Sequence, residues 1–237
     1  MRTTIILLFI SMFIFGCRGG QKEHKAIQSQ NKVAQDSSYL EDKNFNIDQN
    51  KTVPVADSGF LFDGKTLSGW EVTNFGPQGP VSVSGGNIIL GIGDGCTGIT
   101  WLKGFPEINY EVSLEAMRVT GNDFFCGMTF PVGKDPCTLI VGGWGGAVVG
   151  LSSINGRDAS ENETTVLRQF EQKRWYKIRL QVTWKTIKAW IDDKSIVDFV
   201  IGNKKLSIRP EVELSKPFGI ASWNTCAALR NIRVRRL

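Results

Sequence analysis

The chain has 237 residues, with 28 Lys and Arg against 23 Asp and Glu, which gives a formal net charge of +5 at pH 7. The basic residues are scattered or lie at the C-terminal end without forming one stripe, so nothing in the composition calls for a nucleic-acid partner. The single histidine, His24, lies in a polar segment near the N-terminus, so the rest of the chain lacks the commonest general base and metal ligand.

Residues 1–17 predict export and a lipid anchor. Arg2 precedes an apolar run over residues 5–15, which is too short for a permanent membrane span and has the size of a signal-peptide core. Gly16-Cys17 follows and resembles the cleavage site of a bacterial lipoprotein, with Cys17 as the lipidated N-terminus. An ordinary signal peptide and a short uncleaved anchor are the alternatives. We therefore expect a lipid-anchored protein of the bacterial cell envelope, periplasmic or at the cell surface.

Residues 18–57 predict a flexible polar tether, and residues 58–237 predict one folded domain. The tether is rich in Gln, Lys, Asn, Asp and Ser, and such a segment buries too little apolar surface to offset the entropy of ordering it. The remaining residues, about 180, have the size of a single domain.

The domain is predicted to be built of strands, and the clearest pattern covers residues 175–184. Apolar and polar side chains alternate there. The apolar face holds Tyr176, Ile178, Leu180, Val182 and Trp184. Two more strands, at 187–191 and 195–201, follow after short turns and complete a meander.

Shorter runs predict the other strands, at 81–84, 87–90, 110–119, 124–130, 138–141, 219–223 and 229–236. No ten-residue stretch has a clear helical period. Many short strands in one domain predict an all-β fold, a jelly-roll sandwich of two antiparallel sheets.

Four cysteines remain if Cys17 carries lipid: Cys96, Cys126, Cys137 and Cys226. An even number in an exported protein permits disulfides, and buried thiols are the alternative. Of the possible pairs, Cys126 with Cys137 is disfavoured, because a hairpin over residues 124–141 places Cys137 opposite a residue near Phe130. Cys126 would then lie about 13 Å away along the strand, beyond disulfide reach.

Two motifs at the ends of the domain point to a family. Residues 59–70 read GFLFDGKTLSGW, with an Asp-Gly turn between two apolar anchors, and residues 228–237 read ALRNIRVRRL. They resemble the opening LFDG-x-x-L-x-G-W and the closing FRNI-x-I-x-x-L of the 3-keto-disaccharide hydrolase family, also described as 3-keto-glucoside lyase/hydratase domains. The resemblance implies a concanavalin-A-like version of the sandwich and an activity on 3-keto-glycosides.

The middle of the chain departs from that family. Residues 121–124 read GNDF where the family has G-N-S-G, so Asp123 replaces a serine. Residues 137–143 have no carboxylate where relatives read close to E-x-Q-I-x-D. Residues 221–225 have no histidine where relatives carry L-Q-x-H-G. Either this chain uses other groups for catalysis, or it binds sugar without cleaving it.

Two carboxylates on one strand are the first candidate for replacement chemistry. The alternation places Glu111, Ser113 and Glu115 on one face, where two carboxylates could divide acid and base roles. The arrangement resembles the E-x-D-x-E strand of concanavalin-A-like glucanases, with Ser113 in place of the central Asp. The Cα atoms of Glu111 and Glu115 should be about 13 Å apart, so the two side chains would have to lean together to reach the carboxyl separation of about 5.5 Å that a retaining glycosidase needs. A solvated strand face is the alternative.

A glycine-flanked tryptophan is the second candidate. Residues 142–146 read GGWGG, which would leave the ring of Trp144 unshielded and able to stack on a pyranose. A bulged strand with a buried tryptophan is the alternative.

The polar loop at residues 155–165 is the third candidate. Arg157 could bind a carbonyl or a pair of hydroxyls, and Asp158 or Glu163 could remove the proton beside a 3-keto group. A surface loop without function is the alternative.

These observations predict a domain that binds an oligosaccharide or a 3-keto-glycoside, and either cleaves it by carboxylate acid/base chemistry or binds it as a lectin-like module. The candidate catalytic residues, in order, are Glu163, Glu115, Asp123 and Glu111. The candidate substrate-binding residues are Trp144, Arg157, Asn122, Asp158, Asn162 and Asn224. No cofactor or metal site is predicted; calcium at Asp94, Asp123 or Asp158 is an option that no EF-hand spacing supports.

Overall fold

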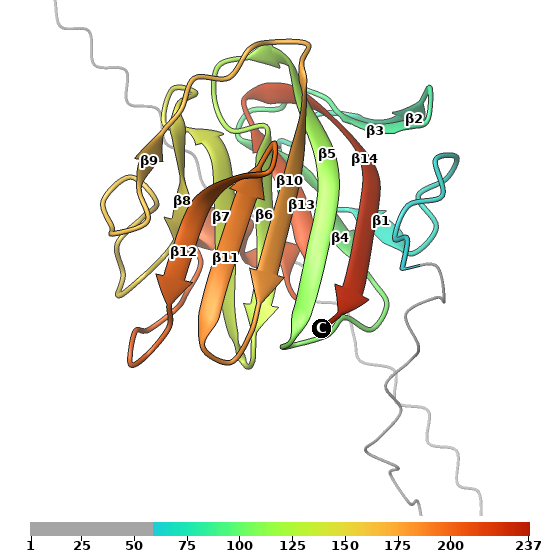
Figure 1. Cartoon of the computed structure of the whole chain (residues 1–237). Coiled ribbons are helices and arrows are strands. Elements are labelled where there is room, and N and C mark those ends of the chain that lie inside the picture. Colours follow the sequence, from blue (N-terminus) through green and yellow to red (C-terminus); the bar gives the residue numbers. More distant parts are fainter. Residues whose placement is uncertain (1–58) are drawn as a thin grey trace, which may run out of the picture. The chain divides into compact units, whose positions relative to one another are not determined.

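The computed structural model describes residues 59–237, and the predicted signal peptide, lipidated Cys17 and tether lie outside these residues. The described part forms two seven-stranded antiparallel sheets packed face to face (Figure 1). One sheet has the order β1-β4-β13-β6-β7-β8-β9, and the other has the order β12-β11-β10-β5-β14-β3-β2. The predicted all-β sandwich is therefore confirmed. No helix within residues 59–237 has the length and hydropathy needed to cross a bilayer.

The strands in chain order are β1 Trp70–Val72, β2 Val81–Ser84, β3 Asn87–Leu90, β4 Cys96–Trp101, β5 Tyr110–Gly121, β6 Cys126–Val132, β7 Asp135–Gly143, β8 Val148–Ser152, β9 Val166–Leu167, β10 Trp175–Val182, β11 Thr186–Ile191, β12 Lys194–Val200, β13 Gly219–Trp223 and β14 Thr225–Arg236. A 3-10 helix, η1 (Pro210–Ser215), precedes β13.

The meander of β10, β11 and β12 is confirmed, and so is the predicted face of β10. Leu180 is fully buried and lies opposite Val112 of β5. The prediction for Trp184 was wrong, because β10 ends at Val182 and the Trp184 side chain is 69% exposed. Thr183 starts a turn there: its amide donates to the carbonyl of Thr186 at 2.9 Å, so the alternation stops before Trp184.

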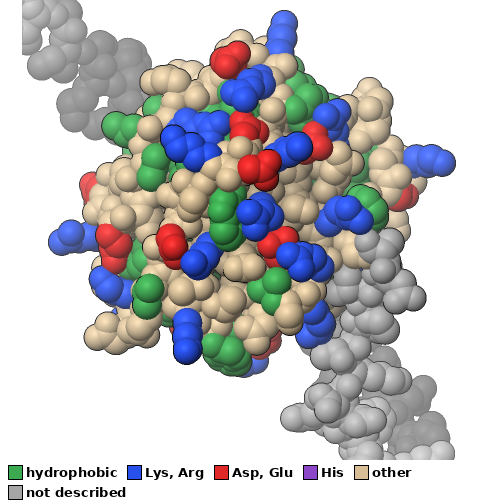
Figure 2. Space-filling model, viewed as in Figure 1, with side chains coloured by type: hydrophobic (Ala, Val, Ile, Leu, Met, Phe, Trp, Pro, Cys, Tyr) green, Lys and Arg blue, Asp and Glu red, His purple; other side chains and the backbone are tan. Residues whose placement is uncertain are grey.

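Four strands were not predicted: β1, β4, β8 and β9. All six residues of β4 and all five of β8 are buried, so these strands have no polar face and no alternation in sequence. The strands β1 and β9 have only three and two residues, too few to show a period. The strands β4 and β8 are thus covered on both faces, while the β5 sheet presents an outer face rich in Lys, Arg, Asp and Glu (Figure 2).

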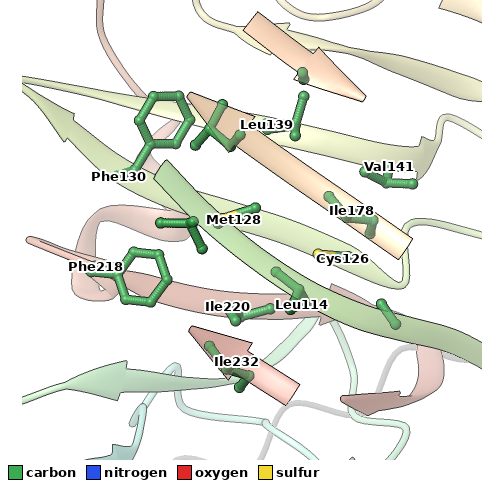
Figure 3. Packing of buried hydrophobic residues seen from close by; sticks show 14 of the residues in the cluster. Leu114, Cys126, Met128, Phe130, Leu139, Val141, Ile178, Phe218, Ile220 and Ile232 are labelled. Carbon is green, nitrogen blue, oxygen red and sulfur yellow. The ribbon is translucent and has the colours of Figure 1, made fainter. Parts of the chain in front are cut away.

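The main core lies between the two sheets, where apolar side chains from both inner faces interlock (Figure 3). Leu114 of β5 and Ile178 of β10 belong to one wall, and Met128 of β6 and Leu139 of β7 belong to the other. A second apolar cluster covers the outer face of the β7 sheet and contains Ile140, the neighbour of Leu139. This second cluster positions the candidate site.

The cysteines agree with the predicted hairpin register. Phe130 of β6 lies opposite Cys137 of β7, and Cys126 lies opposite Val141. Cys96, Cys126, Cys137 and Cys226 are all free thiols in the structure. Burial raises the pKa of the Cys126 and Cys137 thiols far above the ordinary value.

Candidate functional site

A cleft of about 220 Å³ opens on the outer face of the β7 sheet. Its position follows from strand parity: Leu139 and Val141 point into the main core, so Thr138 and Ile140 point outward and line the cleft. The lining residues are Cys96, Asp123, Phe124, Thr138, Ile140, Trp144, Ser152, Arg209, Glu211, Val212 and Trp223.

The cleft contains the segments in which the chain departs from the family pattern. Thr138 and Ile140 come from the strand without the expected carboxylates, and Trp223 comes from the segment without the expected histidine. Asp123 comes from the loop in which it replaces serine. The three segments that depart from the resembled motifs therefore meet in one cleft, to which they contribute two apolar side chains, Ile140 and Trp223, and two polar ones, Asp123 and Thr138.

Aromatic side chains supply much of the lining. Trp144 is 42% exposed, and the ring centroids of Phe124 and Trp223 are 6.4 Å apart. An exposed indole next to apolar walls offers a surface for the C–H face of a ring, with polar groups left to orient its hydroxyls. The predicted exposure of Trp144 is confirmed.

A buried arginine holds the loop that carries Trp144. Arg118 of β5 is 5% exposed, and its Nη2 donates to the carbonyl oxygens of Gly142 at 3.1 Å and Gly146 at 3.0 Å. A Cβ on Gly142 would lie 2.5 Å from this nitrogen, so the glycine permits the approach. Burial lowers the pKa of Arg118, and the charge of Asp123 opposes that shift.

Arg118 was missed from the sequence, although a signal was present. Tyr110, Val112, Leu114 and Ala116 form the inward face of β5, and Arg118 continues the same parity. A cation at an inward position has to find acceptors, which here are carbonyl oxygens rather than a carboxylate.

Asp123 connects to the same loop from the other side. Its Oδ1 accepts from the amide of Phe124 at 2.7 Å, and its Oδ2 accepts from the amide of Gly145 at 3.1 Å. The structure thus brings together two of the predicted site residues, Asp123 and Trp144, and fixes the carboxylate relative to the ring.

Charged side chains form another part of the lining. Arg209 Nη2 lies 2.7 Å from Glu211 Oε1, and Arg209 Nη1 lies 2.5 Å from Asp158 Oδ2. The hydrogen bond from Arg209 lowers the pKa of Glu211, and the same bond raises the pKa of Arg209. The hydroxyls of Ser152 and Ser153 donate to Asp158 Oδ1 at 3.4 and 3.3 Å. Sequence reasoning did not identify Arg209 and Glu211, which lie at the start of η1, a segment without strand or helix period.

The predicted loop at 155–165 lies behind the cleft: Asp158 pairs with the lining residue Arg209, and Ala159 packs in the second apolar cluster, but neither residue is part of the lining. Glu163 forms an ion pair with Lys204 at 2.7 Å, is absent from the cleft lining, and has its pKa lowered by that hydrogen bond. Asn162 Nδ2 donates to the carbonyl of Leu151 at 2.7 Å and so holds the loop on β8. Arg157 is exposed and also absent from the lining.

Two other predicted binding residues lie beside the cleft rather than in its lining. Asn224 follows Trp223, and its Oδ1 accepts from the amide of Gly95 at 2.8 Å. Asn122 is exposed and precedes Asp123, and its carbonyl oxygen packs on Gly146.

The carboxylates of β5 lie elsewhere, on the outer face of the other sheet. Glu111 Oε2 is 3.3 Å from Arg179 Nη1, and Glu111 Oε1 is 3.0 Å from Arg235 Nε. Glu115 Oε2 is 2.6 Å from Arg230. The four predicted catalytic carboxylates therefore do not converge, and only Asp123 lines the cleft.

The aspartates weighed for calcium do not gather with other ligands. Within residues 59–237, no three His, Cys, Asp or Glu side chains lie close enough to hold a metal ion together.

The chain resembles known proteins in sequence and in fold. Residues 58–235 match a family described as the 3-keto-alpha-glucoside-1,2-lyase-like domain. A comparison with curated proteins gave no match.

Solved structures share the fold at low identity. The carbohydrate-binding module CBM66 from Bacillus subtilis is 16% identical, with a TM-score of 0.50, covering 70% of this chain and 95% of the module. The Crh5 transglycosylase in complex with NAG is 14% identical, with a TM-score of 0.50, covering 73% of this chain and 80% of the enzyme. A protein of unknown function with a galectin-like fold from Bacillus subtilis is 11% identical, with a TM-score of 0.53, covering 71% of this chain and 90% of that protein.

Proposed function

We propose that the cleft binds carbohydrate, and the premise is that the chain belongs to the family of 3-keto-alpha-glucoside-1,2-lyase-like domains. The observation that carries the proposal is the exposed Trp144, held on a glycine loop in the same cleft as Trp223, Asp123 and the Arg209–Glu211 pair. Indole rings take the apolar face of a sugar, and carboxylate and guanidinium groups bind its hydroxyls.

The neighbouring folds are consistent with this class of ligand. They include a carbohydrate-binding module and a transglycosylase, so the same sandwich serves both binding and catalysis in other proteins. The ligand of this cleft has to be identified from its own residues.

A titration with a panel of neutral glycans and 3-keto-glycosides tests the proposal. Trp144→Ala should weaken binding by about 1 kcal/mol or more, roughly fivefold in Kd, because the stacking surface is lost. Trp184→Ala is the matched control, since Trp184 is also exposed but lies in the turn after β10. Equal affinities of wild type and Trp144→Ala would refute the assignment of the cleft.

Cleavage of 3-keto-glycosides is a second candidate, favoured by the family match and by carboxylates in the cleft. A ketone at C3 acidifies the proton on C2. A base removes this proton, the electron pair forms a C1=C2 double bond, and the C1–O bond breaks as the leaving sugar takes up a proton. Asp123 is the candidate base, and Arg209 would hold the oxygen of the developing enolate.

The placement of the carboxylates guides the choice of Asp123 over Glu163. Asp123 lines the cleft next to the Trp144 loop, while Glu163 pairs with Lys204 outside the lining. Glu211 also lines the cleft, but Arg209 donates to both of its carboxylate oxygens, and this hydrogen bonding lowers the pKa of Glu211.

Turnover of a 3-keto-glycoside separates the two candidates. Asp123→Asn should lower kcat at least about a hundredfold while the variant still binds glycan, because general-base catalysis contributes roughly 10²–10⁴. Glu163→Gln serves as the control and should leave kcat within about threefold, well below that range. If the wild type binds glycans but cleaves neither 3-keto nor ordinary glycosides with metals supplied, the lectin-like function stands and the catalytic one fails.

We also propose that the domain works at the cell envelope as a lipoprotein. The support is the short apolar run that ends at Cys17 and the polar segment between it and the domain.

A further inference from the structure

A second depression, of about 390 Å³, lies on the outer face of the β5 sheet, the face that Figure 2 shows. It belongs to the opposite sheet from the cleft and shares none of its lining residues. Its floor includes Ser113, the small residue between Glu111 and Glu115 on β5. We call it the Ser113 pit.

Strand register places two arginines on either side of Ser113. Arg179 of β10 lies directly opposite Ser113 on one side, and Arg233 of β14 lies opposite it on the other. Neighbouring strands are about 4.8 Å apart, so the two arginine Cα atoms flank the serine at roughly 10 Å from each other.

Aromatic rings hold both guanidinium groups at the edges of the pit. The Arg179 guanidinium carbon lies 3.7 Å from the ring centroid of Trp190, which is its partner on β11. The Arg233 guanidinium carbon lies 3.9 Å from the ring centroid of Phe60. Stacked in this way, the two groups leave the space above Ser113 open and keep their N–H donors available at its rim.

The charges around the pit leave a positive surplus. Glu111 is already paired with Arg179 and Arg235, and Glu115 is already paired with Arg230. Arg233 also lines the pit, and it has no carboxylate within 4.0 Å among residues 59–237.

The residues that line the Ser113 pit also carry more positive than negative charge. Lys177 lines the pit and, like Arg233, forms no ion pair within the described residues. Asp193, in the turn between β11 and β12, is the lining carboxylate that stands outside the ion pairs described above. Three lining cations therefore face two lining carboxylates, of which Glu115 is neutralised by Arg230.

We propose that the Ser113 pit is a second ligand site, which binds an oxyanion between Arg179 and Arg233. The group is the carboxylate of an acidic sugar, a phosphate or a sulfate, since guanidinium groups bind planar and tetrahedral oxyanions through paired N–H donors. The hydroxyl of Ser113 and the ammonium of Lys177 supply further donors. The site acts independently of the cleft.

The test uses the full chain with Cys17→Ser, so that acylation contributes nothing to the binding measured. The probes are glucuronate, inorganic phosphate, and vesicles of equal parts phosphatidylglycerol and phosphatidylcholine, with glucose as the neutral control. Calorimetry at low salt measures the two soluble anions, and co-sedimentation measures the vesicles. Binding should weaken as salt rises, because the pit is exposed and its charges are screened.

Matched variants locate the binding. Arg233→Gln removes a guanidinium that has no carboxylate partner among residues 59–237, and Ser113→Gln fills the floor without changing charge. Each should raise Kd at least about tenfold, because Arg233→Gln removes a charge-assisted pair worth about that much and Ser113→Gln occupies the space between the two guanidinium groups. Arg236→Gln removes the same charge from β14 outside the pit lining and should change Kd less than about twofold.

The probe that binds assigns the source of the oxyanion: an acidic sugar, free phosphate or a lipid headgroup. Binding of none of the three, or binding that Arg236→Gln weakens as much as Arg233→Gln, overturns the proposal. Failure of glycan binding in the cleft would leave these results unchanged, so the two sites are judged separately.

Discussion

Replacing the buried Arg118 with methionine is the sharpest test of how the cleft is built. The substitution keeps a long apolar stem over Phe125 but removes the donors to the carbonyl oxygens of Gly142 and Gly146. We expect the loop that carries Trp144 to loosen while the two sheets stay intact.

The magnitude follows from the contacts that are lost. Hydrogen bonds from a charged donor contribute about 1.5–3 kcal/mol each, and two such bonds are made at 3.0 and 3.1 Å, while a third, to the carbonyl of Phe170, is long at 3.5 Å and contributes little. The loss is partly offset because methionine no longer has to bury a guanidinium whose Nε has no partner in the structure. We therefore expect the free energy of unfolding to fall by about 2–4 kcal/mol.

Two measurements check this reasoning. Urea unfolding gives the stability loss, and acrylamide quenching of tryptophan emission, compared with and without Trp144→Phe, isolates the mobility of Trp144. Arg118→Lys is the informative control, because it keeps the charge but not the paired donors, and should fall between wild type and Arg118→Met. A stability loss under about 0.5 kcal/mol together with unchanged Trp144 quenching would refute the role of Arg118.

Three further predictions use other parts of the molecule. Leu180→Ala should cost about 2–5 kcal/mol of unfolding free energy in urea titrations, since Leu180 is fully buried between the sheets, and a loss under about 0.5 kcal/mol would contradict that placement. Burial raises the pKa of Glu115, but hydrogen bonds from Arg230 and Asn231 outweigh it and lower the pKa overall. The stabilisation is therefore present above the ordinary carboxyl pKa and is lost as pH falls through the lowered one, so Arg230→Gln should reduce stability at pH 7 but not in strong acid. Cys17→Ser should release the protein from the membrane fraction, and an unmodified Cys17 in soluble mature protein would contradict the lipoprotein assignment.

The strand pattern could be predicted from sequence where a strand has one buried and one wet face. In β10, the alternation of Tyr176, Ile178 and Leu180 with polar neighbours reflects only the local pleat, so the pattern survives without knowledge of the partners. In β4 and β8 both faces are buried, and the local signal vanishes. What covers their outer face is the second apolar cluster, which depends on distant residues such as Val212.

In the candidate site, too, some features could be predicted from the local sequence and others could not. The glycines around Trp144 indicated an exposed ring, with a buried ring on a bulged strand as the alternative, and the structure shows the exposed one. Parity also placed Glu111 and Glu115 on one face of β5, but their roles could not be read from the strand itself. Both side chains lie on the outer face of the β5 sheet, away from the cleft, and form ion pairs with arginines of β10 and β14.

Only the tertiary structure decided which charges meet. Asp123, Arg209 and Glu211 line one cleft although the loop after β5 and the helix η1 are far apart in the chain, and Glu163 pairs with Lys204 instead. The sequence determines the chemical type of each side chain and, on a regular strand, the face on which it lies. Its distance to a partner depends on how strands separated in sequence pair and on where long loops fold back, and no local pattern contains that information.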